Sequence, residues 1–160
     1  MDKLKFNVDN NPFSSLTNEE LDKTISNVFA DFKRFIEARK LQPREKMVDF
    51  LNQCDYTIKI VFAWKKCRDV DKGEYEKGKI AFAQLITLTE DGTGKPKTII
   101  IIRIQNILDY CNAYHPKKAE QFAIIMSVQG IMHELLHIIT LDEELVRKTA
   151  RSYVRSVFGV

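Results

Sequence analysis

Two histidines and a glutamate near the C-terminal end of the chain have the types and spacing of a metal site that activates water. His133 and His137 are four residues apart, and Glu134 follows the first of them. On a helix both imidazoles project from one face, so their nitrogens can reach one tetrahedral zinc ion at about 2.0–2.1 Å. Glu134 is too close along the chain to be a third ligand, but it can accept a proton from water at the open coordination position. The run H-E-L-L-H therefore predicts metal, water and base together.

The alternative is that both histidines are ordinary capping or core residues. Random placement of the chain's residues gives about 0.004 expected matches to H-E-x-x-H, so chance is a poor explanation. A helical wheel also places both histidines in a narrow polar arc without lysine or arginine, which suits a cleft wall better than a solvated face. The arc contains Ser127, Gln129, Gly130, His133, Glu134, His137 and Thr140. Gly130, one turn before His133, would let substrate or another element approach closely.

A catalytic zinc site needs a third protein ligand, and the acidic residues after the run are the candidates. If the helix continued, Glu143 would lie about 9 Å further along its axis than His137, out of reach of the same ion. We therefore expect the chain to turn between Ile138 and Asp142. The sequence T-L-D-E, beginning at Thr140, has the spacing of a capping box that starts a new helix.

On that new helix, Glu143 lies on the face that should pack inward and is the predicted third ligand. Its face contains Val146, Ala150, Tyr153, Val154 and Val157. Glu144 is the alternative ligand, although it aligns with a charged outer face of Arg147, Lys148, Arg151 and Arg155. Asp142 also stays open. His115 is predicted to be a surface residue and Cys111 a small buried one.

The bulk composition bounds the class of protein. A chain of 160 residues suits one domain, and 44% apolar with 29% charged residues is ordinary for a folded soluble protein. The net charge of +3 is too small to indicate nucleic acid as the main partner. No run of about 18 uncharged apolar residues or signal-peptide core is present, and three cysteines without metal spacing fit free thiols. We expect a single domain over residues 1–160, located in the cytoplasm.

The elements that must position the site begin with an irregular arm over residues 1–16. Thr17 and Glu20 have capping-box spacing, and apolar residues at helical spacing predict a helix over 18–40. A second helix is expected over 43–54, opened by a proline.

Strands are expected over 57–64, 79–89 and 97–104, the last two joined by a Gly-rich turn as an antiparallel hairpin. Helices follow at about 117–139 and 141–157. The prediction is an α+β fold with N-terminal helices, a small, mostly antiparallel three-stranded sheet, an active-site helix and a C-terminal helix.

H-E-L-L-H followed closely by D-E-E-L-V resembles the zincin metallopeptidases, and most closely the small glutamate-liganded minigluzincins. The resemblance implies a zincin-like fold, a Zn²⁺ cofactor and hydrolysis of peptide bonds by metal-activated water with Glu134 as general base. It also implies that a peptide substrate pairs with a sheet edge, at 97–104 or at 79–89. Thr140 and Glu143 depart from the metzincin pattern, and no histidine follows His137 as SprT-like proteases require.

Two points stay open at this stage. The donor that stabilises an oxyanion could be Tyr110, Tyr114, His115, Tyr153 or Arg103. The competing functions are a latent or non-catalytic zinc-binding interaction module and a nucleic-acid-associated zinc hydrolase that uses the basic helix face.

Overall fold

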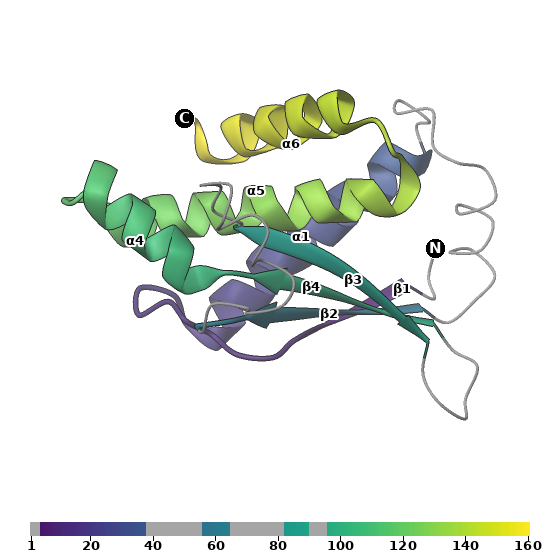
Figure 1. The fold of residues 1–160 in the computed structure, drawn as a ribbon, viewed down its shortest axis with the longest axis horizontal. Helices are drawn as coiled ribbons and strands as arrows, with labels where there is room; N and C mark the ends of the chain where they lie inside the picture. The colour runs from purple at the N-terminus through teal and green to yellow at the C-terminus, as the bar shows by residue number, and fades with distance from the viewer. Residues whose placement is uncertain (1–3, 38–55, 65–81, 90–95) are drawn as a thin grey trace, which may run out of the picture.

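The computed structural model of the protein describes residues 4–37, 56–64, 82–89 and 96–160 (Figure 1). The helix expected over 43–54 lies outside these residues. In chain order, the described elements are β1 (Leu4–Val8), α1 (Asn18–Glu37), β2 (Tyr56–Phe62), β3 (Ala83–Thr89), β4 (Pro96–Ile102), α4 (Ile104–Tyr114), α5 (Ala119–Ile139) and α6 (Glu143–Phe158).

The strands form one mixed sheet in the order β1-β2-β4-β3. β1 pairs with β2, and β2 with β4, in parallel, whereas β3 and β4 form the expected antiparallel hairpin. The prediction of a mostly antiparallel three-stranded sheet is therefore wrong, as is that of a wholly irregular arm over residues 1–16. β1 was detectable, because Leu4, Phe6 and Val8 alternate with polar residues as a half-buried strand requires.

Helix α4 is a second element that the sequence analysis does not predict. β4 ends at Ile102, and Ile104 begins the helix instead of ending the strand, as the expected range 97–104 implied. The signal was present, because Ile104, Ile107 and Cys111 recur at spacings of three and four and are all buried. The continuous apolar run before Arg103 concealed it, since such a run does not show where a strand stops.

The expectation of a helix starting at residue 18 is confirmed by α1. Its capping box is reciprocal: the Glu20 N–H donates to Thr17 Oγ1 at 3.1 Å, and the Thr17 N–H donates to Glu20 Oε1 at 3.0 Å. One apolar face of this helix is buried: Leu21, Ile25, Val28, Phe29, Phe32 and Ile36.

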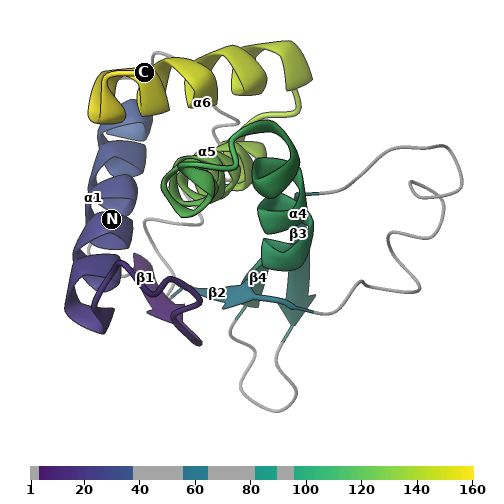
Figure 2. The ribbon, with the colours of Figure 1, turned by 90° about the vertical axis from the view of Figure 1, so that its left-hand side faces the viewer.

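Helix α5 is the centre of the fold. It contacts β3 and β4 of the sheet and all three other described helices. Viewed nearly along α5, Figure 2 shows α1 and α4 on its two sides, the sheet below and α6 across the top. Enclosure on these sides explains why Met132, Leu135 and Leu136 are completely buried.

This enclosure also bears on the composition of α5. The helix has 21 residues and a mean hydropathy of 1.6 over its most apolar window, enough by length and composition to cross a membrane. However, 56% of that window is buried within the protein, as expected of a core helix. The cytoplasmic location stays a prediction.

Candidate metal centre

The two histidines lie in the last two turns of α5, whose bounds agree with the helix expected over 117–139. Their Nε2 atoms are 3.1 Å apart, so both rings present the same nitrogen to one point. The side chains of His133 and His137 are 23% and 21% exposed, which leaves the point accessible from solvent. The one-turn spacing therefore places both imidazoles on one face, as the sequence analysis expects.

The chain turns directly after this face. Thr140 is the C-cap of α5 in an extended conformation, and its Oγ1 accepts a hydrogen bond from the Asp142 N–H at 3.3 Å. Asp142 is the N-cap of α6, where its Oδ1 accepts from the Leu145 N–H at 3.1 Å. The predicted break is thus confirmed, but the predicted cap is wrong: Thr140 stabilises the turn, and Asp142 starts the helix two residues later.

This turn brings Glu143, the first residue of α6, back over the two histidines. Its Oε2 lies 2.7 Å from His137 Nε2, and its Oε1 lies 3.3 Å from His133 Nε2. One ligand atom from each of the three residues falls within 4.8 Å of the others. A tetrahedral zinc ion with bonds of about 2.0–2.1 Å would hold its ligand atoms about 3.3–3.4 Å apart. The observed separations of 2.7, 3.1 and 3.3 Å are at or somewhat below this spacing, and two imidazoles and a carboxylate are a set of side chains that could hold such an ion.

The alternative third ligands have other partners. Glu144 is 78% exposed and pairs with Lys148 Nζ at 3.1 Å on the outer face of α6, as predicted. The Asp142 carboxylate caps its own helix. The predicted inward face of α6 is confirmed over the first three turns of that helix, where Val146, Ala150, Tyr153 and Val154 are buried. It does not extend to Val157, which is 52% exposed. Burial of that face directs Glu143 toward α5.

Glu134 is partly buried beside the cluster. Burial raises the pKa of its carboxyl to about 7, an effect that His137 opposes and Glu143 reinforces. Burial is also the largest cause of a lowered pKa at His133. The neighbouring His137 lowers this pKa further, and Glu143 opposes both effects. A lowered pKa favours the neutral imidazole, the form that binds a metal. The environment of the site thus favours the neutral form of the His133 imidazole and raises the pKa of the neighbouring Glu134 carboxyl.

Gly130, one turn before His133, allows close contact between α5 and β3. A Cβ atom at this position would lie 3.1 Å from Ala83 Cβ, closer than ordinary van der Waals contact. The element whose approach the sequence analysis expects here is thus a strand of the protein itself. Both β3 and β4 contact α5, but β4 is paired on both sides. Of these two strands, only β3 lies at an end of the described sheet.

The five candidate oxyanion donors have neighbours of their own. Tyr110 packs against Phe82 and Tyr114, His115 stacks on Phe122, Tyr153 packs against Phe35, and Arg103 donates to Gln84. Cys111 is a buried free thiol that donates to Met126, which agrees with its predicted structural role. None of these contacts joins a candidate donor to His133, His137 or Glu143.

Arg147 is a residue at the site that the sequence analysis assigns to a solvated face. Its Nη2 lies 3.6 Å from Oε1 of Glu143, one helical turn earlier. The sequence signal for this contact is the i,i+4 spacing of Glu143 and Arg147 on one helix, the same spacing that relates Glu144 to Lys148.

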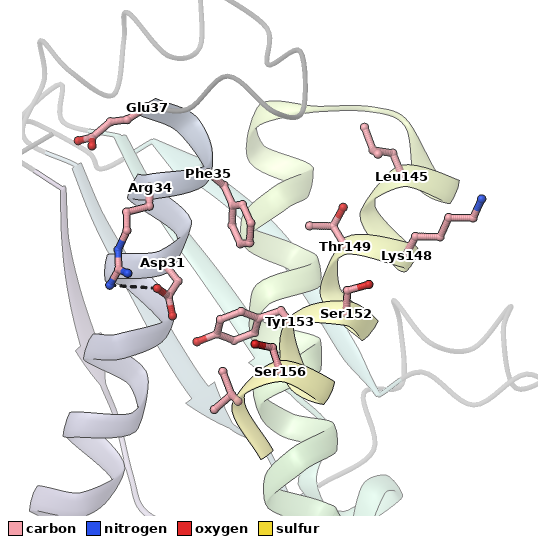
Figure 3. Close-up of a pocket in the computed structure, with 11 residues that line it drawn as sticks. Asp31, Arg34, Phe35, Glu37, Leu145, Lys148, Thr149, Ser152, Tyr153 and Ser156 are labelled. Carbon is pink, nitrogen blue, oxygen red and sulfur yellow. Dashed lines mark ion pairs between the residues drawn. The ribbon is translucent and has the colours of Figure 1, made fainter. Parts of the chain in front are cut away.

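A cavity of about 1000 Å³ lies elsewhere, between α1 and α6 (Figure 3). Phe35 and Tyr153 point into it from the two helices, and the Asp31–Arg34 ion pair lies at its side (3.1 Å). None of the three clustered ligand candidates lines this cavity. The candidate metal centre at the α5–α6 turn is therefore separate from this cavity.

No protein-family model matches the chain, and neither a curated protein nor a solved structure does.

Proposed function

We propose that the protein is a zinc-dependent metallopeptidase. The observation that carries this proposal is the convergence of His133, His137 and Glu143 at the α5–α6 turn, with Glu134 beside them. Two imidazoles and one carboxylate form the ligand set of a hydrolytic zinc site, and a neighbouring carboxylate can serve as its base. The resemblance of H-E-L-L-H and D-E-E-L-V to the minigluzincins supports peptides as the substrate class.

In this proposal, His133, His137 and Glu143 would hold zinc, and a bound zinc ion would lower the pKa of a water molecule toward about 7 and polarise a carbonyl group. Glu134 accepts the proton of the attacking water and delivers it to the leaving amine nitrogen. Its partial burial serves this role, because a desolvated carboxylate binds a proton more readily than an exposed one.

The peptide substrate would lie along β3. Of the two edges that the resemblance left open, β4 is internal to the sheet, so its backbone groups already pair with β2 and β3. β3 runs beside α5, as the Gly130–Ala83 contact demonstrates. An extended peptide added to the outer edge of β3 would therefore pass next to the histidine face.

Zinc content and peptide cleavage, measured in the native chain and in Glu134→Gln, test the proposal. The expected result is about one zinc ion per chain in both proteins and cleavage only by the native one. The glutamine side chain is similar in size but cannot accept the proton. A well-folded native chain that binds no zinc would overturn the proposal.

Zinc binding without cleavage of a peptide library would instead favour the interaction module. That outcome would keep the metal centre and remove the peptidase activity. The basic face of α6 offers little support for a nucleic-acid function, because Arg147 and Lys148 already pair with Glu143 and Glu144.

A further inference from the structure

The carboxylate of Glu143 is held from two sides. Its Oε2 is 2.7 Å from His137 Nε2, whereas Nη2 of Arg147 approaches Oε1 at 3.6 Å. Oε1 is also the more distant oxygen from the imidazoles, at 3.3 Å from His133 Nε2. Arg147 thus contacts the oxygen that the histidines contact less closely.

A glutamate in this position needs such a partner. Glu143 is the first residue of α6, and its side chain is 53% exposed, so little packing restricts its rotamers. Ligating carboxylates are commonly oriented by hydrogen bonds from outside the metal's own ligand set, and loss of such a partner weakens metal binding. A guanidinium, planar and permanently charged, suits the task better than a lysine ammonium.

We propose that Arg147 is a positioning residue for the metal centre: its guanidinium holds Oε1 of Glu143 and so keeps Oε2 turned toward the two imidazoles. This inference rests on the proposed function, because it takes Glu143 as the third ligand. Arg147 itself is not among the clustered ligand candidates.

Two other effects of Arg147 predict different results. A simple charge effect has the opposite sign, since removing a cation near a divalent ion would tighten its binding. A purely structural effect would appear in the metal-free protein as well. The Arg147–Glu143 pair is exposed on both sides, and such pairs contribute little to folding.

Lys148 provides a matched control on the same helix. It is the next residue, carries the same charge and forms the same i,i+4 pair with a glutamate, Glu144, at a shorter distance of 3.1 Å. Its partner is not among the clustered ligands. Lys148→Ala therefore reproduces the loss of one cation and one helix ion pair without disturbing Glu143.

The experiment measures the zinc Kd by competition with a chromophoric chelator in the native chain, Arg147→Ala, Arg147→Lys and Lys148→Ala. We expect Arg147→Ala to bind zinc about tenfold more weakly and Lys148→Ala to stay within about twofold of native. Arg147→Lys should recover part of the loss. Urea unfolding of the metal-free proteins should give closely similar midpoints.

Equal zinc Kd values for Arg147→Ala and Lys148→Ala would overturn the role of Arg147 and leave the metal centre standing, as would tighter binding by Arg147→Ala. A lysine variant weaker than the alanine variant would also contradict the inference. A native chain without zinc affinity would overturn the proposed metal centre itself, so the two failures are distinguishable.

Discussion

His137 Nε2 lies 2.7 Å from Glu143 Oε2, although the two residues belong to different helices. In one continuous helix, the same pair would be separated by about 9 Å along the axis. The extended conformation of Thr140 and the cap at Asp142 remove that separation. The candidate metal centre therefore depends on the α5–α6 turn as much as on the histidine spacing.

The identity of the third ligand gives the first prediction. Glu143→Ala should lower zinc affinity by more than about 100-fold, because a ligand is lost outright and not merely reoriented. Glu144→Ala should bind zinc like the native chain, since the Glu144 carboxylate that it removes pairs with Lys148 on the outer face of α6. Zinc titration of both variants decides between them, and the reverse pattern would transfer the ligand role to Glu144.

The cap of α6 gives the second prediction. Asp142→Ala should lower the free energy of unfolding by about 1 kcal/mol through loss of the N-cap, and should weaken zinc binding by loosening the start of the helix. Asp142→Asn should keep both properties, because an asparagine oxygen caps equally well. Urea unfolding and zinc titration measure the two effects. Loss of zinc in Asp142→Asn, with stability retained, would indicate that Asp142 is itself a ligand.

The close contact between α5 and β3 gives the third prediction. Gly130→Leu should destabilise the protein by about 1–3 kcal/mol, because the new side chain must displace Ala83 or Ile102. Thermal unfolding measures the loss. Gln121→Leu on the exposed part of α5 is the control and should change stability by less than about 0.5 kcal/mol. A glycine variant as stable as this control would contradict the close contact.

The tyrosine between α1 and α6 gives a prediction on pH. Burial raises the pKa of the Tyr153 hydroxyl above its usual range, and Asp31 acts in the same direction. The folded state thus holds this proton more tightly than the unfolded state, whose tyrosine pKa is about 10. The resulting stability is complete below about pH 10 and is lost as the pH rises further, because the unfolded chain then releases the proton first.

Tyr153→Phe should therefore flatten the alkaline decline of the free energy of unfolding, by up to about 1.4 kcal/mol per pH unit. Urea unfolding from pH 8 to pH 11 measures the slope. Tyr114→Phe is the control, since Tyr114 is 68% exposed. Some decline should persist in both variants, because burial also raises the pKa of Tyr56. Identical slopes in the two variants would disprove the contribution of Tyr153.

Elements with strong local signals could be predicted from the sequence. The capping box at Thr17 and Glu20 marks the start of α1, and the apolar periodicity of α5 marks its length. β1 and α4 were missed because their signals are short: five alternating residues in one, and a helix directly adjoining an apolar strand in the other. Parallel pairing of β1, β2 and β4 was beyond the sequence, since it joins segments distant in the chain.

By itself, the sequence determined that His133, Glu134 and His137 lie on one helix and that both imidazoles share a face, because i,i+4 geometry is local and needs no partner. Only the tertiary structure decided that Glu143 approaches them, that Arg147 contacts its carboxylate and that β3 forms the neighbouring edge. Those relationships depend on how α6 and the sheet bury their apolar faces against α5. Packing of surfaces remote in sequence sets the angles between elements, and no local pattern specifies it.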